Sequence, residues 1–453
     1  MYAITMRKFM PFVSMIFFLA LTALCLRYLF NFFPHLTEEV EFQLFVFGSI
    51  LLCGYLINRV APKTAIPSFV WAIFAGMSLQ PMLEFYTHQT EGFKVAMEIM
   101  AALVLFAGGL EVPFKSFKKW FGPIATLSLV GVILSASLFT LGTLVLLSLL
   151  GIYETSLVPA VLILATALAS TDPTAIIPTL KTMRFKRPFL KEIAVSESAL
   201  TDVTGSIITR FVLLALLSIG VSQQSSVVSY LFPLFQKSSY DALALQIMTG
   251  ILIGYLGYAL LKNFYRTVQS HEPNSHEQAD PALLLSIPIF TFVLGNILGG
   301  AGFLAAFISG LLSEIEGGVR KVAHFYTNLL DHLVKPFIFI SLGALVPIDI
   351  LFAYAPLGIL AGLSFIFVIR PLVVFISLLP WLINHTFKFN DLLFLSMIRE
   401  TGIIAAVLLI ISTTYEIIQS NFVISVGMWV ILLTLMIEPP LTPYLSRRIG
   451  VSK

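Results

Sequence analysis

Charged residues are scarce in this sequence. They make up only 11% of its 453 residues, while 58% are hydrophobic and the mean hydropathy is +0.95. Such a composition cannot supply the polar surface of a water-soluble protein, and the small net charge of +3 offers no basic patch for a nucleic acid. Apolar runs long enough to cross a hydrocarbon core of about 30 Å recur along the chain. The composition therefore predicts an all-α polytopic membrane protein.

Cysteine is nearly absent too, and so are the patterns of bound cofactors. Cys25 and Cys53 are the two cysteines, and both fall in predicted membrane helices. Two such thiols build neither a disulfide framework nor a metal site. The glycines over 294–303 lack the order of a phosphate-binding loop. We therefore expect no cofactor and no resident metal.

The apolar runs divide into fourteen candidate crossings. The first lies within residues 1–35, where we favour a retained extra N-terminal helix over a cleaved signal peptide because its apolar run is long. The remaining crossings are predicted over 42–58, 65–80, 93–111, 121–150, 156–179, 190–219, 243–263, 282–297, 301–316, 333–349, 352–381, 392–414 and 422–444.

Alternating these segments across a bilayer places the basic loops on one side. The positive-inside rule makes that side the cytoplasm and puts both termini there, as expected for a multi-pass protein of the cell membrane. Six crossings over 42–219 then run opposite to six over 282–444, with 243–263 as a connector. Two inverted six-helix repeats within one transport domain at 42–444 are typical of secondary transporters, whose site forms where interrupted helices face each other.

The first interruption lies in the stretch "ALASTDPTAIIPTL", residues 167–180. Pro173 opposes continuous helical hydrogen bonding, and Thr171 and Asp172 beside it offer oxygens to a small cation. A carboxylate within a membrane segment is by default a functional candidate. The alternative is a plain proline kink in which Asp172 caps the half-helix that follows.

The next crossing carries a second aspartate. Helical spacing puts Ser198, Asp202 and Ser206 on one face with Gly205 beside them, so Asp202 is expected to point into a cavity at the broken helix. A carboxylate removed from water binds a proton more readily and releases it when a cation takes its place. For the small residues Ser198, Gly205 and Ser206, close helix packing is the alternative.

The fifth crossing of the second half has a matching irregularity in "IRETG", with Arg399 and Glu400. Intramembrane charges require partners, and Glu197 and Arg370 are further candidates for pairing across the two halves. A purely structural scaffold would gain nothing from burying these groups.

At these residues a resemblance emerges. "STDPTAI" followed by "SESALTDVTGS" resembles the paired signature of the monovalent cation:proton antiporter superfamily, in its sodium/proton exchanger branch. The blocks "LVLFAGGLEVPFKSF", "GFLAAFISGLL" and "IRPLVVFISLLP" resemble, in order, the flanking segments of that branch. The resemblance covers nearly the whole chain from about residue 45.

The resemblance implies a fold and a mechanism. Family members are homodimers in which a core domain with two crossed, discontinuous helices moves against a dimerisation domain, giving alternating access. Carried over to this chain, it implies Asp202 as the exchanging carboxylate and a pair between Glu197 and Arg370. It also implies Arg399, followed by the unusual Glu400, at the second unwound region. The cation-binding residues would be Thr171, Asp172, Ser198 and Thr201.

The function expected is exchange of Na⁺ or K⁺ for H⁺ in pH homeostasis, by a transporter and not an enzyme. Thr201 stands where electrogenic relatives have a second aspartate, which favours one-for-one, electroneutral exchange. The choice between sodium and potassium stays open. Two alternatives are a potassium efflux antiporter gated by a ligand or partner, and, more distantly, an intramembrane aspartyl protease, whose sequence contexts differ from Thr-Asp-Pro and Leu-Thr-Asp.

Overall fold

The computed structural model describes residues 40–64, 67–80, 90–219, 227–271, 281–313, 325–326, 328–415 and 418–452. The predicted N-terminal helix within 1–35 lies outside these residues, so its retention stays a prediction. Helices account for nearly all of the described chain, in which the only β pairing is an isolated bridge between Phe185 and Ser452. The predicted all-α class is confirmed.

Every predicted crossing after the first is matched by a helix or by an interrupted pair of helices. The first half contains α2 (Val40–Val60), α3 (Ser68–Ser78), α5 (Thr90–Glu111), α6 (Phe114–Lys119), α7 (Phe121–Leu149), α8 (Val158–Leu168), α9 (Pro173–Lys181) and α10 (Phe189–Ile219). α11 (Val227–Leu231) and the long connector α12 (Lys237–His271) follow. The fifth crossing of this half is divided between α8 and α9, where the sequence predicts the interruption.

The second half begins with α13 (Pro281–Ile297) and α14 (Gly302–Ser313), and a π-helical turn η5 (Leu330–Val334) leads into α16 (Lys335–Ala344). α17 (Ile348–Ala353) and α18 (Ala355–Ser364) continue through a second π-helical turn, η6 (Phe365–Ile369), into α19 (Arg370–Ser377). The remaining helices are α20 (Leu379–Ile383), α21 (Phe389–Leu395), α22 (Ile403–Ser412) and α23 (Ser420–Arg448). Here too the fifth crossing is interrupted, between α21 and α22.

Length and composition mark this chain as a multi-pass membrane protein. Seven helical segments in the described chain are long and apolar enough to cross a bilayer, and five shorter apolar helices accompany them. The predicted thirteen or fourteen crossings include these shorter and interrupted helices as well. On α12, Leu245, Met248, Leu252 and Tyr255 are each at least 60% exposed, an apolar face that suits lipid better than water.

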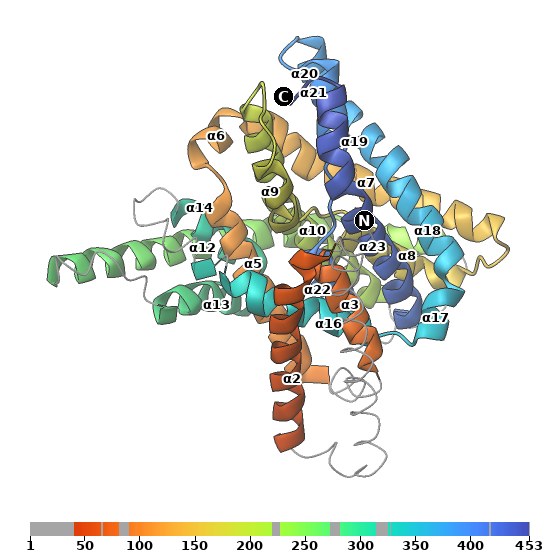
Figure 1. Cartoon of the computed structure of the whole chain (residues 1–453), viewed down its shortest axis with the longest axis horizontal. Helices are drawn as coiled ribbons and strands as arrows, with labels where there is room; N and C mark the ends of the chain where they lie inside the picture. Colours follow the sequence, from red (N-terminus) through yellow and green to blue (C-terminus); the bar gives the residue numbers. More distant parts are fainter. Residues whose placement is uncertain are drawn as a thin grey trace, which may run out of the picture.

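The helices pack as two groups (Figure 1). We call α2, α3, α5, α12, α13, α14 and α16 the scaffold group, because α5, α12 and α13 pack around α14 while α2 and α3 pack on α16. The core group comprises α7, α8, α9, α10, α18, α19, α21, α22 and α23. In Figure 1, α12 to α14 lie at one end of the molecule and α7 and α18 at the other.

One close helix contact occurs twice in the scaffold group. A Cβ on Gly76 of α3 would lie 2.0 Å from the Ile340 carbonyl oxygen of α16, and one on Gly310 of α14 would lie 2.1 Å from the Phe106 carbonyl oxygen of α5. Only glycine allows backbones this close. The contact joins the second crossing of one half to the third crossing of the other in both cases, as two inverted repeats require.

Candidate functional site

The first break spans residues 169–172. Pro173 is the first residue of α9, where its missing N–H is not needed because the first helical N–H groups have no partner within the helix. Pro178 lies inside α9 and does not interrupt it. The opening that the sequence predicts therefore lies on the N-terminal side of Pro173 alone.

Asp172 caps two half-helices at once. Its Oδ1 accepts hydrogen bonds from the Thr174 backbone N–H at 2.8 Å and from the Thr174 hydroxyl at 2.7 Å, at the start of α9. Its Oδ2 accepts from the Ile403 N–H at 2.9 Å, at the start of α22. A carboxylate at a helix N-terminus offsets unpaired N–H groups and the helix dipole. Asp172 therefore does cap the half-helix that follows it, which was the alternative interpretation, and it also caps α22.

Gly402 makes this double cap sterically feasible. A Cβ there would lie 1.9 Å from Asp172 Oδ2, so a larger residue would displace the carboxylate. The Asp172 N–H also donates to the Glu400 carbonyl oxygen at 2.8 Å, which joins the backbones of the two breaks. The interrupted helices therefore meet at their interruptions.

The second break spans residues 396–402, and its Arg399 side chain places a positive charge at the first break. The Arg399 guanidinium donates to the Ala169 carbonyl oxygen at 2.8 Å and to the Leu168 carbonyl oxygen at 3.4 Å, where α8 ends. It lies 4.6 Å from the centroid of the Phe365 ring. A cation at a helix C-terminus binds its unpaired carbonyls, so the two breaks cap each other's helices reciprocally.

A pair of threonines holds each break against the following long helix. In the first half, the Thr171 and Thr201 hydroxyl oxygens lie 2.5 Å apart, and the Thr171 N–H donates to Thr201 Oγ1 at 3.2 Å. In the second half, the Thr401 and Thr434 hydroxyl oxygens lie 2.7 Å apart, and the Thr401 N–H donates to Thr434 Oγ1 at 3.4 Å. The sequence-based interpretation missed this second pair.

Asp202 lies on α10 next to the first break. It is 2% exposed, and its Oδ1 has no hydrogen-bond partner in the described structure. Asp172 and Glu197 lie near enough for a negative charge on either to repel one on Asp202. A Cβ on Gly205 would lie 3.1 Å from Ser170 Cβ, so small residues do bring α10 close to the break here. Ser198 lies on the same helix, and its hydroxyl donates to the Thr171 carbonyl oxygen at 2.8 Å.

Glu197 and Arg370 form a buried bidentate ion pair. The guanidinium nitrogens lie 3.0 and 3.1 Å from the two carboxylate oxygens, and each side chain is 1% exposed. Arg370 also donates to the Leu395 carbonyl oxygen at 3.2 Å, at the end of α21. The pair that the resemblance implies therefore exists, and it joins α10 to α19 beside the second break.

The sequence-based interpretation also missed Glu438. It lies on α23, is 1% exposed, and its Oε2 accepts the Arg399 N–H at 2.7 Å. An acid in the apolar run "LTLMIEPPL", inside the predicted crossing 422–444, is itself a signal of function.

Carboxyl groups outnumber cationic groups around the two breaks. The buried acids are Asp172, Glu197, Asp202, Glu400 and Glu438, and the buried bases are Arg370 and Arg399. One oxygen of each of Asp202, Glu400 and Glu438 has no hydrogen-bond partner in the described structure. A buried negative charge without compensation is costly. The site must therefore hold protons, cations or both.

A cavity of about 410 Å³ reaches Asp172 between the two helix groups. The scaffold group contributes Asn58 and Lys335, and the turn η5 that leads into α16 contributes Asp331. The core group contributes Thr174 and Pro178 of α9 together with part of α23. Lys335 Nζ lies 2.6 Å from Asp331 Oδ1. Polar and charged groups thus line the cavity beside the first break.

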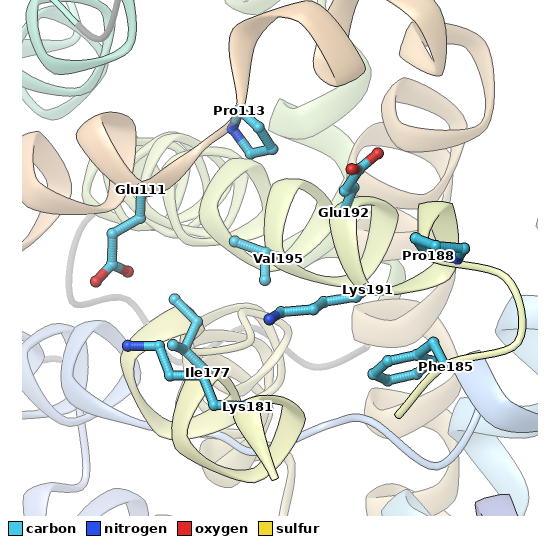
Figure 2. Close-up of a pocket in the computed structure, with 9 residues that line it drawn as sticks. All are labelled: Glu111, Pro113, Ile177, Lys181, Phe185, Pro188, Lys191, Glu192 and Val195. Carbon is cyan, nitrogen blue, oxygen red and sulfur yellow. The ribbon is translucent and has the colours of Figure 1, made fainter. Parts of the chain in front are cut away.

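A second cavity, of about 540 Å³, lies near the basic end of α9 (Figure 2). Glu111 at the end of α5 points into it from the scaffold group, while Lys181 and Lys191 extend into it from α9 and α10. Ile177 and Val195 form an apolar part of its wall. α9 therefore borders open space shared with the scaffold group in both cavities.

Comparison with known proteins agrees with this geometry. The family model described as sodium/hydrogen exchanger, transmembrane, matches residues 47–447. The chain belongs to the sodium/hydrogen exchanger family. Family membership confirms the resemblance found in "STDPTAI" and "SESALTDVTGS".

Known members of the exchanger family resemble this chain over most of its length. It is 25% identical over 378 residues to Na(+)/H(+) antiporter 1 of Methanocaldococcus jannaschii, covering 80% of this chain and 81% of that protein. It is 23% identical over 341 residues to K(+)/H(+) antiporter NhaP2 of Shewanella oneidensis, covering 74% of this chain and 54% of that protein.

A solved structure shares the fold. The sodium proton antiporter MjNhaP1 from M. jannaschii at pH 8 superposes with a TM-score of 0.72, at 22% sequence identity, over 91% of this chain and 99% of that one. The predicted architecture of interrupted helices in an exchanger-type fold is therefore confirmed.

Proposed function

We propose that this protein is a secondary active antiporter that exchanges a monovalent cation, Na⁺ or K⁺, for H⁺ by alternating access. The observation that carries the proposal is Asp202, a buried carboxylate with an unpartnered oxygen beside the meeting point of two broken helices. Family membership and the antiporter names of its relatives support the same activity.

Asp202 is the group proposed to exchange its ligand. Protonated, it is neutral and tolerates burial; ionised, it needs a cation beside it. Thr171, Ser198 and Thr201 hold the adjacent backbone open and offer oxygens near it. Asp172 already accepts three hydrogen bonds, so we assign it chiefly to positioning the two half-helices and secondarily to attracting the cation.

The exchange is proposed to be electroneutral. Thr201 leaves Asp202 as the sole carboxyl of the Thr201-Asp202 pair, so a single positive charge, either a proton or a cation, balances it in each state. The curated relatives include proteins named for sodium and for potassium, so both ions belong in the test.

Alternating access is proposed to move the core group against the scaffold group. The cavity that reaches Asp172 lies between these groups, and α9 contributes to both cavities. We further propose a homodimer in the cell membrane with the basic loops and both termini in the cytoplasm, on the basis of the positive-inside rule.

The central test is transport in proteoliposomes. A sodium or potassium gradient should drive proton movement by the wild-type protein, and Asp202→Asn should abolish it because asparagine cannot exchange a proton. Full cation-dependent proton movement by Asp202→Asn would refute the assignment. Glu154→Gln removes an exposed carboxyl on a loop and is the matched control, expected to transport like wild type.

A further inference from the structure

The second break contains an acidic site of its own. Glu400 is 2% exposed and Glu438 is 1% exposed, and Glu400 Oε2 and Glu438 Oε1 have no hydrogen-bond partner in the described structure. Neither oxygen takes part in the reciprocal capping by Asp172 and Arg399. Two buried, unpartnered carboxyl oxygens require a ligand that the capping network does not supply.

The two acids are held near each other by the fold. Glu438 Oε2 binds the Arg399 N–H at 2.7 Å, and Glu400 is the next residue along the chain. The contact between Thr401 and Thr434 joins the same two segments, with Glu438 one helical turn beyond Thr434. Glu438 and Asp172 lie near enough to Glu400 for a negative charge on either to repel one on Glu400.

This arrangement parallels the site at Asp202. In the first half, a threonine pair joins the break to α10, and a carboxyl follows on that helix at Asp202. In the second half, a threonine pair joins the break to α23, and a carboxyl follows at Glu438. The inverted repeat therefore presents hydroxyl and carboxyl groups at both breaks, while the exchanger proposal uses only the first.

We propose that Glu400 and Glu438 form a second proton site, in which the two carboxyls share one proton. Two carboxyls held together in a buried site do not both ionise, because their negative charges repel and neither is solvated. With one proton, the pair carries a single negative charge, which balances the adjacent Arg399.

A proton fits this site better than a metal cation. The Arg399 guanidinium already supplies one positive charge next to the pair, and a metal cation would add a second at short range. The other charged groups around the breaks give no further positive charge, because Arg370 is engaged by Glu197. The remaining carboxyls, Asp172 and Asp202, would be repelled further if the pair lost its proton.

Infrared spectroscopy of the whole protein in lipid tests this proposal directly. Protonated carboxyl groups absorb in a C=O stretching band separate from that of carboxylates. Removing either acid leaves one carboxylate balanced by Arg399, so Glu400→Gln, Glu438→Gln and the double variant should each lose the same band area, equivalent to one proton. Glutamine preserves the side-chain size and, at 438, the acceptor for the Arg399 N–H.

The outcomes separate this proposal from the antiporter proposal. Asp202→Asn should lose band area that adds to the loss in Glu400→Gln, and Glu154→Gln should lose none. An unchanged band in both single variants, or a double variant that loses twice the single amount, would overturn the shared proton. If one variant does not fold, the other still decides whether a proton is lost. The band does not depend on transport, so a failed transport assay leaves this result intact.

Discussion

The breaks in the two halves are held by matching threonine pairs, but the side chains that they contribute to each other carry opposite charges. The Asp172 carboxylate of the first break accepts a hydrogen bond at the N-terminus of α22, and the Arg399 guanidinium of the second break donates one at the C-terminus of α8. Each break therefore completes a helix of the other half. Residues 171 and 401 are held by matching threonine pairs, but only the first break has an aspartate directly after its partner threonine.

Some buried charged groups at the two breaks cap helix ends, whereas others keep a carboxyl oxygen without a hydrogen-bond partner in the described structure. Exposed helix ends are costly in a membrane unless they are capped or line a polar cavity. The Asp172 and Arg399 side chains cap three of the four interrupted helix ends, and Arg370 binds the Leu395 carbonyl oxygen at the fourth. The capping leaves one oxygen of Asp202 without a hydrogen-bond partner in the first half, and one oxygen each of Glu400 and Glu438 in the second, among the described residues.

The largest effect is expected from breaking the buried ion pair that joins the two halves. Glu197→Gln leaves Arg370 buried without a counter-charge and should destabilise the protein by about 3–5 kcal/mol. Thermal unfolding in detergent measures the loss. Arg187→Gln breaks the pair between Arg187, which is 30% exposed, and Asp391, whose Oδ2 keeps the hydrogen bond from the Lys388 N–H, and should cost less. Equal losses would show that the Glu197 pair does not hold the halves together.

A smaller effect is expected from separating the two breaks sterically. Gly402→Ala places a methyl group 1.9 Å from Asp172 Oδ2, which should displace the carboxylate from Ile403 N and cost about 1–3 kcal/mol. Cation-dependent proton movement should also fall, because the displaced carboxylate no longer holds the start of α22 in place. Gly142→Ala is the matched control, because no atom lies within 4 Å of its Cβ position. Wild-type transport by Gly402→Ala would mean that the double cap is dispensable.

The smallest effect compares the two threonine pairs. Thr201→Val and Thr434→Val each remove one buried hydroxyl that accepts a backbone N–H, and each should cost about 1–2 kcal/mol of stability. Stability should fall by similar amounts because the two threonine pairs match. Transport should fall more in Thr201→Val, since Thr201 adjoins Asp202. Equal transport losses would contradict the division of tasks between the halves.

Much of the fold could be read from the sequence because membrane helices carry their signal locally. Apolar length located the crossings, and Pro173 after Asp172 located the first interruption. Glu438 was overlooked although it lies inside the predicted crossing 422–444, which corresponds to α23 and ends at Arg448 in the structure. The reciprocal caps could not be predicted, since Asp172 and Ile403 lie 231 residues apart.

The sequence by itself determined the class of protein, the two interruptions and the acids within the membrane segments, because hydrophobic length and proline act over a few residues. Only the tertiary structure decided how those acids divide between capping and an unpartnered, titratable state. A carboxylate's role depends on which N–H groups and charges lie within about 3 Å of it. For Asp172, one of those groups is the Ile403 N–H, which comes from the opposite half of the chain.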